Sequence, residues 1–445
     1  VQNLGERLYA GLGIALYDLM AIRGGNSLPH HRHLSHKQMQ STAPGLSPHA
    51  HRGAIVYSDA SVDDARYVVS VARTAAQFGA LILTSTKVTD LISSGGRVCG
   101  AEVRCLESGR QLKVSCGTVV NATGVWSDDI EKFAGENTSR VRASKGIHLV
   151  IPRDRVDLET ALILRTSESV LFIIPSDTHW IVGTTDSDWQ LDRAHPAASK
   201  ADIDYLLATV NQVVKRPLTI QDVVGVYVGL RPLLKGEADK TSKLSREHAV
   251  TISTEGLVSI SGGKYTTYRI MAADTIDAVG IDQGQTLPKS PTAGIPLIGA
   301  QDYQRVKGRA SEISQKCGAQ LADINHLISR HGDRIDEVLN LITADESLGE
   351  LIHPDLPYLR AEVIHAVRFE AALHLEDVLT RRTRLSVESW DRGTDSALQV
   401  AQLMARELGW DESRVHREVE HYVKRVESER SSNSQLDDED ADASR

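Results

Sequence analysis

Apolar positions at strand spacing fill two long parts of the chain. Residues 79–124 and 142–260 carry short apolar runs, many with every second position polar, as in strands that bury one face. In the first part, residues 81–83 have the pattern of a strand, and residues 94–96 and 107–109 have the small and glycine residues of hairpin turns. We therefore predict a β-meander in the first part and a longer antiparallel sheet in the second.

Other parts of the chain have apolar positions three to four residues apart, the spacing of helices with one buried face. The helix after residue 61 should start with a capping box of Ser61 and Asp64, and Asp63 and Asp64 suit the positive end of its dipole. Glycine and proline at residues 283–299 predict a linker before a helical C-terminal domain. The predicted helices cover residues 4–20, 62–78 and 201–214, and most of 302–426.

Two apolar strands end in residues that suit a ligand. The run at residues 118–124 is typical of a buried parallel strand and stops in small residues, which let a ligand approach the backbone. The run at residues 223–230 ends at Arg231 and Pro232, where an arginine can bind an anion through two hydrogen bonds. Taken alone, a surface salt bridge is the simpler interpretation of that arginine.

A third strand pattern, at residues 257–261, runs into Gly262, Gly263 and Lys264 and then into a helical pattern. Unpaired amides at the start of a helix, the helix dipole and the lysine charge together favour an anion. An ordinary strand-to-helix turn accounts for the same residues about equally well. A P-loop is excluded, because Tyr265 follows the lysine and no glycine lies five residues before Gly263.

Composition narrows the class of protein. The chain has 59 acidic residues and 50 lysines and arginines. Its net charge of −9 argues against a nucleic-acid-binding protein. The four cysteines form no CxxC pair, which favours a reducing cytoplasm, and no apolar run reaches the ~18 residues of a membrane span. The histidines at positions 30, 31, 33 and 36 could bind zinc or copper, but we interpret them as a surface loop and predict no metal site.

Three motifs together give the chain a family resemblance. They are Asn121-Ala-Thr-Gly124, Gly229-Leu-Arg-Pro232 and Ser261-Gly-Gly-Lys-Tyr-Thr-Thr-Tyr-Arg269. With them, the chain resembles the FAD-dependent, quinone-linked glycerol-3-phosphate dehydrogenases of the glycine-oxidase-like flavoprotein superfamily. The resemblance covers nearly all of the chain except its acidic tail, with further matching segments at residues 57–66, 144–148, 182–186 and 375–384.

The resemblance implies an α/β (α+β) fold: an FAD-binding, glycine-oxidase-like fold with an antiparallel-sheet substrate domain and a C-terminal helical domain. The acidic, serine-rich tail is expected to be disordered. The expected division is a partial FAD-binding domain at 1–140, a β-rich substrate-binding cap at 141–260, a return strand and helix of the FAD domain at 261–285, a helical domain at 295–427 and the tail at 428–445.

The resemblance also implies roles for individual residues. Lys264 and His148 are the catalytic candidates, and with Arg231, which would bind the phosphate, they are the substrate-binding candidates. The reaction implied is hydride transfer from C2 of sn-glycerol 3-phosphate to flavin N5, giving dihydroxyacetone phosphate, with electrons passed to a membrane quinone. The expected FAD contacts are Val88, Ala122, Thr123, Gly124, Gly262, Gly263, Lys264, Tyr265 and Thr266.

The implied partners are sn-glycerol 3-phosphate and quinone, with a homodimer as a candidate assembly. The expected location is the cytoplasm, with peripheral attachment to the inner face of the cell membrane as an option. Members of the family begin with a strand and a GxGxxG fingerprint for the FAD pyrophosphate, followed by a His-Gly-Gly-Leu-Arg-type segment. Neither occurs here, so we expect an N-terminally truncated member. A non-catalytic remnant and a related glycerophosphate oxidase are the alternative hypotheses.

Overall fold

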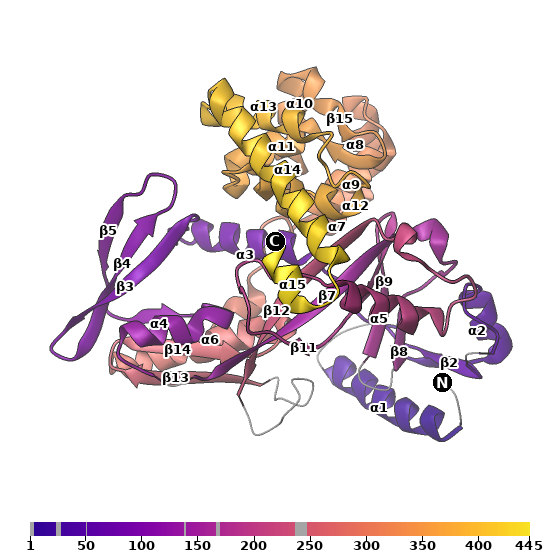
Figure 1. Cartoon of the computed structure of the whole chain (residues 1–445), viewed down its shortest axis with the longest axis horizontal. Helices are drawn as coiled ribbons and strands as arrows, with labels where there is room; N and C mark the ends of the chain where they lie inside the picture. Colours follow the sequence, from indigo (N-terminus) through magenta and orange to yellow (C-terminus); the bar gives the residue numbers. More distant parts are fainter. Residues whose placement is uncertain (1–3, 24–27, 50, 138, 166–169, 236–246) are drawn as a thin grey trace.

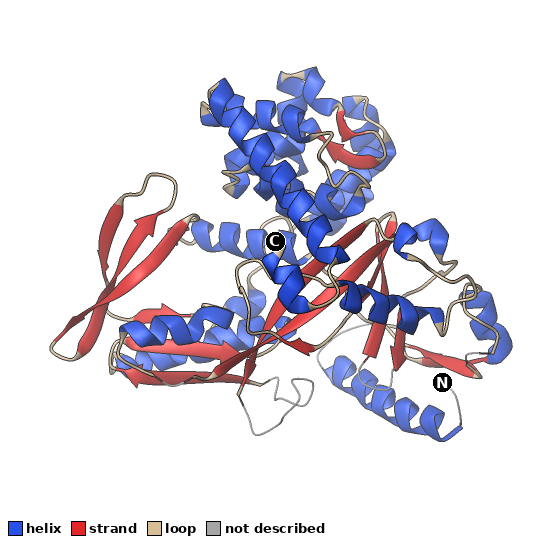
Figure 2. Cartoon of the chain, in the orientation of Figure 1, coloured by secondary structure: helices blue, strands red, loops and turns tan. Residues whose placement is uncertain are grey.

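Sheets in the middle of the molecule lie beneath a helical C-terminal domain, and a β-meander projects from one end (Figure 1). This computed structural model describes residues 4–23, 28–49, 51–137, 139–165, 170–235 and 247–445. Figure 2 shows that the strands gather in the lower half of the view and that helices make up most of the upper half.

The largest described sheet has six strands, and β7 lies at its centre. β7 pairs antiparallel with β10, β11 and β12, and β9 and β8 extend the sheet beyond β10, so the predicted antiparallel sheet is present. The strands are β7 (Val141–Pro152), β8 (Leu162–Arg165), β9 (Val170–Ser176), β10 (His179–Gly183), β11 (Ser187–Asp188) and β12 (Gly225–Leu234).

The two faces of β7 have different environments. Ile147, Leu149 and Ile151 are fully buried and share one core with Ile203 and Leu206 of helix α5 (Lys200–Asn211). Side chains alternate along a strand, so Ser144, Gly146 and His148 point to the opposite face. Because one face of β7 is buried against α5, only the side chains on its opposite face are available for a binding or catalytic site.

A second sheet contains the predicted parallel strand. β6 (Val119–Asn121) pairs parallel with β14 (Leu257–Gly262), and β13 (His248–Thr254) pairs antiparallel with β14. The predicted strand β14 is almost completely buried, and its small polar side chains, Ser259 and Ser261, are buried together with its apolar ones. Both β6 and β14 run into helical turns, and α4 (Ser127–Phe133) and α6 (Tyr268–Asp282) follow them.

The meander is present, although the strand predicted before it is not. β3 (Thr86–Ser94), β4 (Arg97–Cys105) and β5 (Gln111–Ser115) form a three-stranded antiparallel sheet, with turns at the two predicted places. Residues 81–83 form no strand, and 92% of the Leu81 surface is exposed. Their apolar pattern matches a strand, but no described strand pairs with them.

The N-terminal region contains α1 (Leu4–Arg23), β1 (Arg32–Ser35), α2 (His36–Thr42), β2 (Gly53–Val56) and α3 (Asp64–Gln77). Three of the four clustered histidines lie in or before β1, which pairs with β2, where we had expected a loop. The cap of α3 also differs from the prediction. Asp63 is the N-cap and accepts the amide of Arg66, whereas Ser61 lies outside the helix.

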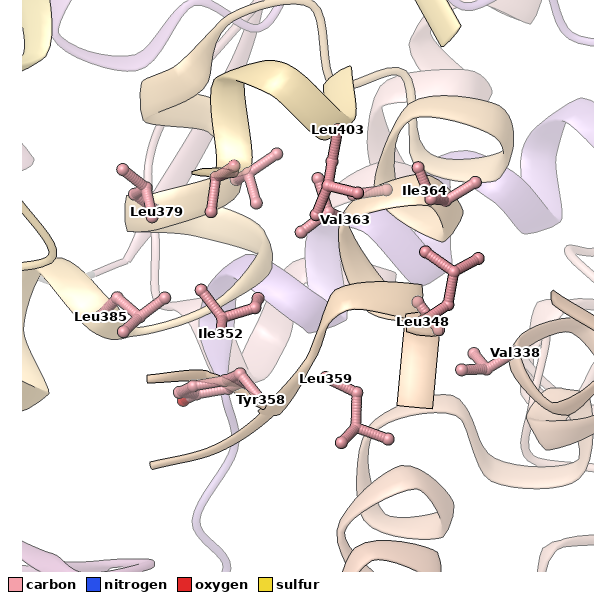
Figure 3. Close-up of a cluster of buried hydrophobic side chains, with 14 of the residues drawn as sticks. Val338, Leu348, Ile352, Tyr358, Leu359, Val363, Ile364, Leu379, Leu385 and Leu403 are labelled. Atoms are coloured by element: carbon pink, nitrogen blue, oxygen red, sulfur yellow. The ribbon is translucent and has the colours of Figure 1, made fainter. Parts of the chain in front are cut away.

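The C-terminal domain is a helical bundle with a small hairpin. Its apolar core includes the labelled side chains of Figure 3, among them Val338, Tyr358 and Leu379, which are all fully buried. Its elements are α7 (Tyr303–Gly308), α8 (Ala310–Cys317), α9 (Leu321–His331), α10 (Ile335–Ala344), β15 (Leu351–His353), β16 (Leu356–Leu359), α11 (Arg360–Glu370), the π-helix η9 (Asp377–Arg382), α12 (Leu385–Glu388), α13 (Ala397–Leu408), α14 (Glu412–Ser434) and α15 (Asp438–Ala443).

The acidic tail is helical, so the expectation of disorder is wrong. α14 continues to Ser434, and α15 packs its fully buried Ala441 into a small apolar cluster with Trp189. Asp438 binds the ammonium group of Lys145 at 2.5 Å on the α5 side of β7. Acidic composition predicts disorder for a segment on its own, whereas here a buried lysine and an apolar contact order it. Within the described residues, no helix is long and apolar enough to cross a membrane.

Candidate active site

Strands β7 and β12 bring two of the family-matching segments, residues 144–148 and 229–232, to one sheet face. In their antiparallel register, Ser144 lies opposite Arg231, Gly146 opposite Gly229, and His148 opposite Tyr227. Directly opposite residues of neighbouring strands point to the same face. This face is the one that α5 leaves uncovered, and both strands cross the middle of Figure 1.

Arg231 lies across the backbone of Gly146. Its Nη2 donates to Oγ1 of Thr184 at 2.9 Å, and Nη1 donates to the carbonyl oxygen of Thr185 at 3.2 Å. A Cβ on Gly146 would lie only 2.4 Å from Nη2, so glycine is what allows the guanidinium to rest there. The acceptors of these two bonds are a hydroxyl and a backbone carbonyl oxygen, which hold the guanidinium across the strand.

His148 is held between Tyr227 and Gly183. The imidazole stacks on the Tyr227 ring at 4.9 Å between centroids and 13° between planes, and a Cβ on Gly183 would lie 2.4 Å from its Cδ2. Burial and the charge of Arg231 lower the pKa of His148 to about 4, although Asp64 acts to raise it. The imidazole is therefore neutral near pH 7. Its buried Nδ1 has no hydrogen-bond partner among the described residues.

Tyr227 stays protonated for a similar reason. Burial and the negative charges of Asp64 and Asp63 raise its pKa to about 12, against the opposing effect of Arg384. A neutral phenol ring stacked on a neutral imidazole keeps that imidazole in one orientation. Tyr227, Asp63 and Asp64 were not predicted as site residues. Their proximity to His148 depends on the pairing of β12 with β7 and on the packing of α3.

The turn after β14 places Lys264 at the surface. Gly262 and Gly263 have φ values of 75° and 90°, which favour glycine, and the amide of Gly263 donates to the carbonyl of Glu247 at 3.0 Å. Lys264 is exposed and precedes the short 3-10 helix η5 (Tyr265–Thr267). The hydroxyl of Tyr265 donates to the carbonyl oxygen of Asp64 at 3.0 Å. The turn is thus held by contacts to the residue before β13 and to the start of α3.

Small residues at the end of β6 lie beside β12. Ala122 and Thr123 are exposed, and Thr123 donates through its hydroxyl to Oδ1 of the buried Asn121 at 2.7 Å. Gly124 has a φ of 60°, and a Cβ there would lie 3.9 Å from Cγ of Pro232.

Leu234, two residues beyond Pro232, lies against Gly262, because a Cβ on Gly262 would be 2.9 Å from its Cγ. The structure thus brings the Asn121, Gly229 and Ser261 motifs together around β12. Val88 is separate from them, since it lies in the meander opposite Val103.

A candidate metal cluster in the C-terminal region is better explained as an ion network. His331, His365 and Glu370 are buried, and their possible ligand atoms lie within 4.8 Å of one another. Among the described residues, this group alone has three possible metal ligands so close together. However, Arg66 lies 2.6 Å from Glu370, and a second arginine, Arg73, lies 4.0 Å from it. These positive charges oppose a bound cation. The histidines at positions 30 to 36 form no such cluster.

Comparisons with known proteins identify the family of the chain. The profile of a family described as FAD dependent oxidoreductase matches residues 11–269, and that of the C-terminal domain of alpha-glycerophosphate oxidase matches residues 290–415. A Mycobacterium tuberculosis protein named glycerol-3-phosphate dehydrogenase 2 is 48% identical over 438 residues, which cover 98% of this chain and 74% of that protein. The human mitochondrial glycerol-3-phosphate dehydrogenase is 31% identical over 428 residues, covering 93% of this chain and 58% of the human one.

A solved structure supports the fold. The glycerol-3-phosphate dehydrogenase from Bacillus halodurans complexed with FAD superposes with a TM-score of 0.77 at 28% identity, covering 89% of this chain and 78% of that one. The predicted combination of an FAD-binding region, an antiparallel sheet and a C-terminal helical domain is therefore confirmed as a fold class.

Proposed function

Because this chain belongs to the glycerol-3-phosphate dehydrogenases among the FAD-dependent oxidoreductases, we propose that it oxidises sn-glycerol 3-phosphate to dihydroxyacetone phosphate with FAD as cofactor. The observation that carries the proposal is the shared face of β7 and β12. There the guanidinium of Arg231 lies over Gly146, and the neutral His148 follows two residues further along the strand. Two residues of a strand span about 7 Å, a separation that a three-carbon phosphate ester can bridge.

The described residues fit the flavin end of FAD. Ala122 and Thr123 are exposed and small at the carboxyl end of a parallel strand, where the backbone is open to a flat ring system. Gly262, Gly263, Lys264, Tyr265 and Thr266 form the neighbouring turn, and the exposed Lys264 would supply a positive charge there. In our proposal, residues 122–124 and 262–266 hold the flavin, and Val88 contacts the adenosine side of FAD. Bound FAD supplies the acceptor for the hydride from C2.

Each substrate contact then has a chemical task. Arg231 binds the phosphate through a charge-assisted pair of hydrogen bonds and fixes the orientation of the ester. The low pKa of His148 keeps its ring neutral near pH 7, and in the tautomer with the proton on Nε2 its Nδ1 accepts the proton of the C2 hydroxyl. Lys264 stabilises the negative charge that develops on the same oxygen. The hydride and the proton leave the substrate separately, and a ketone remains at C2.

The proposal extends to the electron acceptor, the assembly and the location. The family resemblance supports a membrane quinone as the acceptor, a homodimer, and a cytoplasmic protein with peripheral attachment to the inner face of the membrane. The alternative is a glycerophosphate oxidase, in which oxygen takes the electrons. The match of residues 290–415 to the C-terminal domain of alpha-glycerophosphate oxidase supports this alternative. Consumption of oxygen against reduction of a quinone analogue distinguishes the two.

The test is the visible spectrum of the purified 445-residue chain, before and after anaerobic addition of sn-glycerol 3-phosphate. The proposal predicts a flavin absorption band that bleaches with this substrate. Arg231→Met should need far more substrate for the same bleaching, whereas Arg165→Met, an exposed arginine of the same sheet, should behave as the unmodified chain. A chain that stays colourless with added FAD would support the non-catalytic alternative.

A further inference from the structure

An arginine of the C-terminal domain binds two successive carboxylates beside the candidate active site. Arg384 follows η9, and its Nη2 donates to Oδ1 of Asp63 at 2.8 Å and to Oδ1 of Asp64 at 2.9 Å. Its Nε donates to the second oxygen of Asp63 at 3.3 Å. The Arg384 and Asp63 side chains are 22% and 30% exposed, so their contact is better shielded from water than an ordinary surface ion pair, whereas the Asp64 side chain is 69% exposed.

Both aspartates also form hydrogen bonds with other parts of the chain. Asp63 caps α3, because its Oδ1 also accepts the amide of Arg66 at 3.1 Å. The backbone carbonyl of Asp64 accepts the hydroxyl of Tyr265 at 3.0 Å, and Tyr265 directly follows Lys264. A continuous series of hydrogen bonds therefore runs from the C-terminal domain to the turn that carries Lys264.

A second contact joins the same domain to the strand that carries Arg231. α12, which begins one residue after Arg384, lies against the start of β12. The carbonyl oxygen of Val387 is only 2.4 Å from where a Cβ on Gly225 would be. Gly225 lies two residues before Tyr227, which stacks on His148. The C-terminal domain thus contacts the site through α3 and through β12.

We propose that the C-terminal domain completes the active site, with Arg384 as the positioning residue that holds Asp63, Asp64 and Tyr265 in their places. The inference rests on the proposed function, to which it adds a task for a domain outside the substrate face. Arg384 acts through the aspartates and is not itself a catalytic residue. The fixed geometry of the Lys264 turn and the neutralised charge of Asp64 are its two effects.

The electrostatic effect can be followed at His148. The charged and titratable groups that the described structure places around this imidazole are Asp64 from α3 and Arg231 and Tyr227 from β12. Asp64 acts to raise the pKa of His148, and the guanidinium of Arg384 at 2.9 Å offsets that negative charge. Removal of the guanidinium should therefore raise the pKa of His148, while a lysine at position 384 should largely prevent this rise.

Hydrogen exchange tests the geometric effect without any catalysis. In the full chain, Arg384→Met should increase exchange in the peptide that contains Tyr265 by about tenfold, because the turn loses its hold through Asp64. The matched control is Arg381→Met, since Arg381 belongs to the same motif but binds Glu376 at 2.8 Å and Asp377 at 3.2 Å within its own domain. Equal exchange of that peptide in both variants would overturn the proposal, whatever the enzymatic activity.

Kinetics with sn-glycerol 3-phosphate separates positioning from simple destabilisation. Arg384→Met should lower kcat/KM roughly 10- to 100-fold and move the acid limb of its pH profile to higher pH, whereas Arg384→Lys should keep the limb in place. The same Arg384→Met change in an Asp64→Asn background should no longer move the limb. A loss of activity with an unmoved limb, or a limb that moves equally in Arg381→Met, contradicts the positioning role. Absence of turnover in the unmodified chain would instead refute the proposed function, and the exchange experiment would still decide this inference.

Discussion

Gly146 offers a direct test of the phosphate contact, because its missing side chain makes room for Arg231. In Gly146→Ala, the new methyl group would lie 2.4 Å from Nη2 and 2.7 Å from Nη1 of Arg231, so the guanidinium must move. The end of an arginine side chain moves easily, and the strand backbone here suits alanine, so the fold should survive. We expect a change in the free energy of unfolding below about 1 kcal/mol.

The effect on catalysis should be much larger. Displacing the guanidinium removes charge-assisted hydrogen bonds to the phosphate, which contribute about 1.5–3 kcal/mol. This corresponds to a loss of roughly 10- to 150-fold in kcat/KM for sn-glycerol 3-phosphate. With glycerol, which has no phosphate, Gly146→Ala should have little effect, so the preference for the phosphorylated substrate should fall by the same factor.

The matched control for stability is Gly229→Ala. Gly229 lies directly opposite Gly146 on β12, and a Cβ there meets no atom within 4 Å. Chemical denaturation of both variants gives the cost of an alanine at this level of the sheet. If Gly146→Ala folds and keeps its full preference for sn-glycerol 3-phosphate over glycerol, the assignment of Arg231 to the phosphate is refuted.

Two clusters of ion pairs join the C-terminal domain to α3 and to the meander, and they lead to further expectations. Arg66→Met leaves the carboxylate of Glu370, whose side chain is 1% exposed, without its partner at 2.6 Å, so the free energy of unfolding in urea should fall by about 3–5 kcal/mol. The double variant Arg66→Met/Glu370→Gln should recover much of that loss, and equal loss in both would contradict the explanation. Glu418 and Glu107 raise the pKa of His374 to about 9 from 6.5, so its contribution to stability is complete below pH 6.5 and disappears as the pH rises through 9. His374→Gln should therefore lose less stability between pH 6.5 and 9 than the unmodified chain, and equal urea midpoint shifts would show that His374 is not responsible.

Local pattern predicted the elements whose signal is complete in a few neighbouring residues. The glycines at residues 95 and 109 suit their hairpin turns, and the run at residues 118–124 contains the parallel strand β6, although this strand is not fully buried, since Val120 is 41% exposed. The pattern failed where a distant partner decides. Residues 81–83 are apolar, but no strand in the described part of the chain pairs with them, and Asp63, not Ser61, caps α3 while also binding Arg384.

The candidate site was predictable in its motifs but not in its neighbours. Arg231 and His148 could be named from their segments, and the structure places them on one face. The stacking of Tyr227 on His148 depends on the register of β7 with β12, nearly eighty residues apart in the chain. The contact of Arg384 with Asp64 spans 320 residues, and no local spacing encodes it. The catalytic, substrate and cofactor roles themselves remain predictions that the experiments above address.

The bond between Lys145 and Asp438 has a consequence for the order of folding during synthesis. The two residues are 293 positions apart, and the Lys145 side chain is fully buried in the finished protein. At the roughly 5–20 residues per second of translation, Asp438 leaves the ribosome some 15 to 60 seconds after Lys145. Until then, Asp202 is the described carboxylate that can bind this ammonium group. We infer that the buried Lys145 of the central sheet acquires its second carboxylate partner only after residue 438 has been synthesised, long after the strands of the sheet have emerged.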